Sequence, residues 1–210
     1  MVCVTALGLP GSLQQLLNEL QTTLFREHGL VGARALPPLI PLSWAHYPGE
    51  ASRDALPSSP DAERLIPAAP NRLPLLTPER YCVHGNALYL EYGPAEALKL
   101  LADAAEAAQS DAAQSDAAWA GACLAAREAA PESAEGVLLA FGPPEVLRAA
   151  ANLLPAPPSQ PLRQAWWQII ALESLSEHRL SSGPESPWWY ALRYEVLAER
   201  RIAKARETTP

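Results

Sequence analysis

The sequence predicts an α+β protein with antiparallel or mixed sheets and helices packed on the outer faces. Three observations support this class. Short apolar, β-rich runs alternate with helical periodicity, Gly-Pro steps separate them, and the last third holds two aromatic runs in succession. The 210 residues, of which 49% are hydrophobic and 19% charged, suffice for a sizeable core. The predicted order is β-α-β, a loop, β-α-β-α and β-β.

The first half begins with a strand and a helix. Residues 2–9 are a short apolar run, and leucines then recur on one helical face, with Ser12 as the expected cap and Gly29 as the expected stop. The proline-containing run 33–47 is predicted to be extended. Because proline cannot donate to a central ladder, we expect an edge strand there. Residues 48–80 hold seven prolines and are predicted to be an irregular loop.

The second half repeats this order. The strand NALYLEY, residues 86–92, ends at a Gly-Pro step before the helical run 95–108. The strand GVLLAFG, residues 136–142, is followed in the same way by the helical run 145–154. The recurrence of strand, Gly-Pro and amphipathic helix suggests an internal pseudo-repeat.

Two features complete the chain. The tandem QSDAA copies at 109–118 are interpreted as a duplication in a tolerant surface region, compatible with one long helix or with two. The aromatic runs 166–175 and 188–197 predict a hairpin or two neighbouring strands. One tryptophan of each Trp-Trp pair is expected in the core, and an exposed partner could recruit another protein.

Composition limits the function classes. A net charge of -7 and a pI near 5.1 argue against non-specific nucleic-acid binding. The basic tail, residues 200–210, is interpreted as a solvated end with helical charge pairs, and RNA contact is the alternative. The sequence has no apolar run of membrane-spanning length and no basic segment typical of a signal peptide. We therefore expect a cytoplasmic protein with no membrane partner.

The cysteines point to a reducing compartment rather than a disulfide framework. Cys3, Cys82 and Cys123 are odd in number and form no CxxC pair. Cys82 and His84 stand two residues apart, but without a second pair of ligands we interpret them as a thiol and an ordinary histidine. No metal and no cofactor are predicted.

In layout, the chain resembles the two-histidine (2H) phosphoesterase superfamily. The resemblance rests on the strand-helix-strand halves, a first strand ending ALGLP, the proline-preceded strand near residue 40, GVLLAFG near residue 140 and two closing strands. It implies a single bilobal, pseudo-symmetric domain over residues 1–210. Members include bacterial 2′-5′ RNA ligases and RNA 2′,3′-cyclic phosphodiesterases, in which each lobe contributes a strand with a His-x-Thr or His-x-Ser motif.

The catalytic residues of that family are missing here. Leu39 and Gly136 stand at the histidine positions, and Pro41 and Leu138 at the hydroxyl positions. A residue two positions along a strand points to the same face, so we expect two apolar rows on the strands that would hold the phosphate. These rows are Leu39, Pro41 and Ser43 on one strand and Gly136, Leu138 and Ala140 on the other. No catalytic residue is therefore assigned.

The four histidines of the chain lack a hydroxyl residue two positions later. Only His46, just past the first motif strand, has a positional argument, and His84 is the other alternative. Phosphate-binding loops, nucleophile elbows and HExxH motifs are absent from the sequence.

Three functional hypotheses follow. The first is a non-catalytic 2H-like binding or interaction protein whose cleft receives an apolar ligand or an unidentified protein. The second is an RNA or cyclic-nucleotide phosphodiesterase with a relocated site at His46 or His84. The third is a structural subunit recruited through exposed tryptophans.

Overall fold

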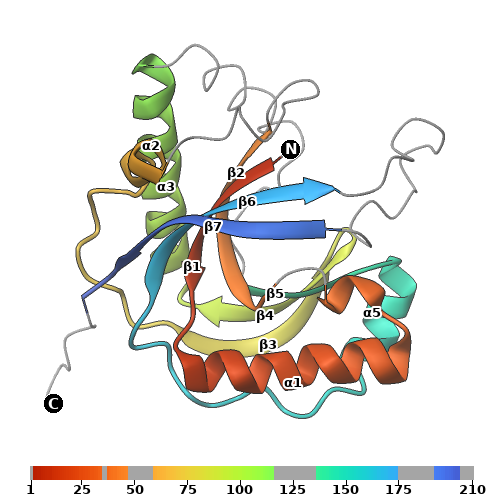
Figure 1. Cartoon of the computed structure of the whole chain (residues 1–210). Helices are drawn as coiled ribbons and strands as arrows, with labels where there is room; N and C mark the ends of the chain where they lie inside the picture. The colour runs from red at the N-terminus through yellow and green to blue at the C-terminus, as the bar shows by residue number, and fades with distance from the viewer. Residues whose placement is uncertain (1, 35–36, 47–58, 116–135, 175–191, 204–210) are drawn as a thin grey trace, which may run out of the picture.

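The computed structural model describes residues 2–34, 37–46, 59–115, 136–174 and 192–203. Within them the chain forms an α+β fold with one seven-stranded antiparallel sheet, which confirms the predicted class. The strands follow the order β3-β4-β5-β2-β1-β6-β7 across the sheet (Figure 1). The elements are β1 (Val2–Gly8), α1 (Gly11–His28), η1 (Val31–Arg34), β2 (Leu39–His46), α2 (Ser59–Arg64), β3 (Thr77–His84), β4 (Ala87–Gly93), α3 (Ala95–Ser115), β5 (Gly136–Phe141), α5 (Pro144–Ala151), β6 (Trp166–Ser174) and β7 (Leu192–Arg201).

The described part of the predicted loop 48–80 contains regular structure. Residues 59–64 form α2, and the end of the loop belongs to β3. Leu65 and Leu73 are buried in the core, so this proline-rich segment packs against the sheet and its helices. Prediction of a purely irregular loop was wrong here because β3 is an edge strand whose side chains are mostly exposed or half-buried. It therefore shows no apolar alternation.

Alternate strand residues divide the buried side chains into two clusters. The larger lies on the face covered by helices and includes Leu7, Ile40 and Val137 together with side chains of α1, α3 and α5. We call this side of the sheet the helix face. The smaller, which we call the strand cluster, contains only strand residues among those described: Val4, Ala6, Leu39, Ala87, Tyr89, Leu138, Ile170 and Leu172. We call this second side the strand face.

The strand β2 lies in the middle of the sheet, between β5 and β1, so the expectation of an edge strand was wrong. The physical reason is that Pro41 stands beside an irregularity in the β1–β2 register. On its other side, β2 pairs with β5 at a single position, Leu39 with Leu138. A strand with so little pairing at its proline tolerates the missing backbone donor.

The helix ends follow the expected glycine but not the expected serine. Gly29 ends α1 in the left-handed conformation, with φ 66°, and its backbone N–H bonds the Leu24 carbonyl. The N-cap is Pro10 rather than Ser12, and no side chain caps the helix. The helix α3 runs through the first QSDAA copy as far as Ser115, and the rest of the second copy lies outside the described residues.

The two closing strands are confirmed as the neighbours β6 and β7. Trp167 is buried and Trp166 is half-buried, as expected for adjacent strand residues, whereas Trp188 and Trp189 lie outside the described residues. The start of the basic tail is strand rather than helix, because Arg200 and Arg201 belong to β7. No helix among the described residues is long and apolar enough to cross a membrane.

Candidate functional site

The two strands that were aligned with the motif strands of the 2H family, β2 and β5, meet at the centre of the sheet. Leu39 on β2 and Leu138 on β5 are directly paired, and both belong to the strand cluster. Both are about 2% exposed, and Pro41 and Gly136 are also buried. The structure thus brings together the four positions that stand for the motif residues, and their side chains offer no group that can transfer a proton at neutral pH.

Ser43 and Ala140 lie on the opposite face from these four positions, contrary to the expectation that each row shares one face. In β2, Ser43 pairs with Thr5 while Pro41 pairs with Ala6, so Leu42 is an extra residue. Because Thr5 and Ala6 are neighbours on a strand, their partners point to opposite faces. This bulge turns Ser43 to the helix face, where it is 6% exposed and its Oγ has no hydrogen-bond partner among the described residues.

A second bulge acts in the same way on β5. Ala140 pairs with Leu88 and Leu138 with Tyr89, which makes Leu139 the extra residue. Ala140 consequently joins the core under the helices. At this bulge the buried Gln21 of α1 donates a hydrogen bond from Nε2 to the carbonyl oxygen of Leu139, at 3.2 Å.

Gly136 is a steric requirement of its position. Its φ is 156°, and a Cβ added there would lie 2.0 Å from the Leu90 carbonyl oxygen and 2.8 Å from the Glu91 Cα. Both atoms belong to the backbone of β4, so no side-chain movement relieves the overlap. A histidine at this position would require β5 to move away from β4.

A polar cluster lies beside this position, on the hairpin of β3 and β4. Cys82 pairs with Tyr89 and His84 pairs with Ala87, which places both side chains on the strand face. Glu91 lies two residues beyond Tyr89 on the same face and is the direct partner of Gly136. The ligand atoms of Cys82, His84 and Glu91 lie within 4.8 Å of one another.

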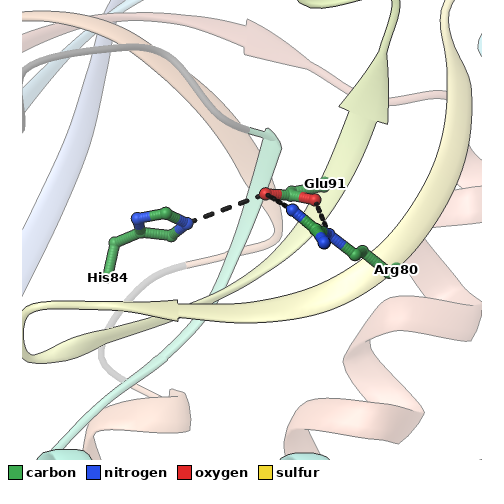
Figure 2. Close-up of polar contacts among 3 residues, drawn as sticks. All are labelled: Arg80, His84 and Glu91. Carbon is green, nitrogen blue, oxygen red and sulfur yellow. Dashed lines mark hydrogen bonds and ion pairs between the residues drawn. The ribbon is translucent and has the colours of Figure 1, made fainter.

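Glu91 is the centre of this cluster (Figure 2). Arg80 donates from Nε to Glu91 Oε2 at 2.5 Å and from a terminal nitrogen to Oε1 at 3.4 Å. His84 Nε2 lies 3.7 Å from Oε1. The side chain of Glu91 is 16% exposed, while those of Arg80 and His84 are 74% and 46% exposed. The cluster is therefore open to solvent through Arg80 and His84.

The electrostatics favour an ionised Glu91. The hydrogen bond from Arg80 lowers the pKa of the Glu91 carboxyl, partial burial opposes this, and a hydrogen bond from the Cys82 thiol and the charges of Arg80 and His84 lower it further. The ring of His84 also contacts Tyr89 edge to face, with centroids 6.3 Å apart, which restricts the imidazole. The group is a fixed carboxylate with an imidazole and a thiol at its side.

The local sequence explains why the hairpin brings these groups together. Gly85 and Asn86 connect β3 and β4, and Gly85 has a φ of 54°, as a tight two-residue hairpin turn requires at its first position. This turn fixes the register in which Cys82 lies opposite Tyr89. Residues 84–87 could have predicted the hairpin, whereas Glu91 could join the cluster only once that register was known.

The other histidines are elsewhere. His28 is the last residue of α1. His46 is the last residue of β2 and pairs with Val2, but its side chain lies outside the described part of the chain, as does all of His178. Of the two alternative site residues, only His84 has a described environment, and that environment is polar.

Comparison with known proteins supports the fold. No protein-family model matches the chain, and no curated protein matches it. The chain is similar to a solved structure, the crystal structure of TT0787 of Thermus thermophilus. The TM-score is 0.51, the sequence identity is 17%, and the alignment covers 96% of this chain and 98% of that chain. At this identity the likeness extends to the fold alone, over nearly the full length of both chains.

Proposed function

We propose that the chain is a 2H-phosphoesterase-like protein that lacks both catalytic histidines and functions as a non-catalytic binding or interaction module. This proposal depends on which residues lie at the centre of the sheet. There, Leu39, Pro41, Gly136 and Leu138 stand at the four motif positions.

The strand order supports the two-lobed arrangement that this family implies. Reading outward from the β2–β5 junction, β1 and β6 lie on one side and β4 and β3 on the other. Each half contains a strand-helix-strand unit, β1-α1-β2 or β4-α3-β5, and each helix contacts the central strand of the other unit, α1 with β5 and α3 with β2. This reciprocal crossing is what a pseudo-twofold axis at the junction would produce.

The two bulges support the same axis at the level of single residues. Aligning Leu39 with Gly136 places Pro41 on Leu138 and the extra residue Leu42 on the extra residue Leu139. A bulge re-aims the side chains that follow it and is a specific feature of a strand rather than a defect. Two bulges at equivalent positions support a common origin of β2 and β5 and the motif alignment itself.

The chemistry of these positions argues against phosphodiester turnover. Opening a cyclic phosphodiester requires a base for the attacking oxygen and an acid for the leaving one, and imidazole suits both because its pKa is close to neutrality. Leucine, proline and glycine provide neither group. They also bury apolar surface that gains nothing from a charged phosphate. An apolar molecule or an apolar segment of a partner protein suits the strand face better, and because these side chains are already buried it would have to displace the groups that cover them.

The test is a turnover assay with the full-length protein on 2′,3′-cyclic nucleotides and 2′-5′-linked RNA, with and without added divalent metal. We expect no hydrolysis above the uncatalysed rate. Metal-independent turnover that is lost in the His46→Ala variant would overturn the proposal.

A binding assay gives the positive readout. Trp44 packs against the strand cluster, so a neutral apolar fluorophore bound at the strand face should accept energy from it. We expect saturable binding with reduced energy transfer in Trp44→Phe and a smaller reduction in the control Trp167→Phe, because Trp167 lies on the helix face. Absence of saturable binding would contradict an apolar ligand.

The polar cluster favours a second candidate, a phosphodiesterase with a relocated site. Imidazole and guanidinium converge on one carboxylate at His84, Arg80 and Glu91. Against it, the carboxylate neutralises the guanidinium that a phosphate would need. This candidate predicts metal-independent turnover that falls by about 100-fold or more in His84→Ala, as expected for loss of a general acid or base, and remains intact in His28→Ala.

A further inference from the structure

We propose that Cys82, His84 and Glu91 form a binding site for one divalent transition-metal ion of the zinc type. The site lies on the β3–β4 hairpin and is independent of the proposed function. A thiolate, an imidazole and a carboxylate are the three donor types that Zn²⁺ accepts in proteins.

The distances are close to those that one ion would impose. A tetrahedral ion holding nitrogen and oxygen at about 2.0–2.1 Å separates these two ligands by about 3.4 Å. His84 Nε2 and Glu91 Oε1 are 3.7 Å apart, and all three ligand atoms lie within 4.8 Å of one another. The separation of His84 Nε2 and Glu91 Oε1 is thus within about 0.3 Å of the value that one ion would impose.

The surroundings prepare the ligands for an ion. Arg80 donates from Nε to Glu91 Oε2 and from a terminal nitrogen to Oε1, so it orients the carboxylate, and Oε1 also faces His84. The Tyr89 ring borders the imidazole of His84. Such outer contacts orient ligands in known metal sites and affect their affinity.

Two further features favour a metal over a purely structural polar cluster. Cys82 and His84 stand two residues apart on one face of β3, and Glu91 lies on the neighbouring strand β4. The tight turn between these strands therefore fixes the positions of all three ligands. The imidazole is 46% exposed, which leaves an ion a route from solvent. Three protein ligands leave the fourth tetrahedral position for water or another ligand, which is the pattern of reactive rather than closed zinc sites. On binding, the Cys82 thiol would release its proton to solvent as the sulfur–metal bond forms.

The experiment is a Co²⁺ titration of the tag-free, full-length protein after chelator dialysis, monitored by absorption. Thiolate coordination gives a charge-transfer band in the near ultraviolet, and tetrahedral geometry gives intense visible bands. We expect saturation at one equivalent per chain and displacement by Zn²⁺. The thiolate band should disappear in Cys82→Ser and persist in Cys123→Ser.

Loss of the other ligands should weaken binding without loss of the fold. We expect His84→Ala and Glu91→Gln each to lower the Zn²⁺ affinity about ten-fold or more, and the control His28→Ala to leave it unchanged. Zn²⁺ should also raise the unfolding midpoint of the wild type and not of Cys82→Ser, because an ion that binds only the native state stabilises it. No thiolate band at any Co²⁺ concentration, or a band that depends on Cys123 instead of Cys82, would overturn the proposal.

Discussion

Replacing Gly136 with alanine should destabilise the protein by about 3 kcal/mol or more, since the conformation alone costs about 1–3 kcal/mol and broken pairing adds to it. The added Cβ would lie 2.0 Å from the Leu90 carbonyl oxygen, where ordinary contact begins at 3.4 Å, so the backbones must separate by about 1.4 Å, the difference of the two. Each β4–β5 hydrogen bond weakened by that shift contributes about 1 kcal/mol.

The assay is urea unfolding followed by tryptophan fluorescence, with the free energy extrapolated to water. The loss should be readily measured, because domains of this kind are stable by only about 5–15 kcal/mol. Gly11→Ala is the matched control: at the first residue of α1 a Cβ meets nothing within 4 Å, so we expect no loss. A Gly136→Ala variant within about 0.5 kcal/mol of the wild type, the range of a neutral surface change, would refute the claim that the position excludes a side chain.

Three further predictions concern the same sheet. Leu138→Ala should lower the free energy of unfolding by about 2–5 kcal/mol, as for other buried leucines, and urea unfolding measures this; a loss under about 1 kcal/mol, below the usual core range, would contradict its central packing. Gln21→Leu should cost about 1–3 kcal/mol because the Leu139 carbonyl loses its buried donor, whereas the exposed Gln15→Leu should be neutral. Burial raises the pKa of the Tyr92 phenol. The unfolded chain therefore loses this proton at a lower pH than the folded protein. The stability present below the ordinary tyrosine pKa of about 10 should be lost as the pH rises above it. Tyr92→Phe should reduce this alkaline loss; an unchanged pH profile of the urea midpoint would contradict it.

Much of the fold could be predicted from local pattern. The strands at 2–8, 87–93 and 136–141 and the helices that follow them agree with the apolar periodicity and the Gly-Pro steps. Gly29 was a correct stop because a left-handed helix end favours glycine on conformational grounds alone. These features depend on residues close together in the sequence.

What failed depends on pairing between distant strands. Pro41 predicts an edge strand by its missing donor, and only the register with β1 and β5 shows why a central strand tolerates it. The same registers contain the bulges that turn Ser43 and Ala140 to the helix face. A two-residue period along a strand cannot reveal such a reversal, because the extra residue is defined by the partner strand.

The polar cluster of Cys82, His84 and Glu91 likewise depends on strand register, which local sequence pattern does not reveal. It also supplies the ionisable groups that the motif positions lack. Because of the two bulges, the motif positions that lie on the strand face carry only apolar residues. Gly136, one of them, cannot accept a side chain unless β5 moves. At the Gly136 position, groups that bind ions or transfer protons therefore come from the neighbouring strand β4. Glu91 of β4 is the direct partner of Gly136, and with Cys82 and His84 it places such groups beside that position. The variant His84→Ala separates the two uses of this cluster: reduced metal affinity without any turnover to lose favours a metal site, whereas loss of a metal-independent turnover favours catalysis.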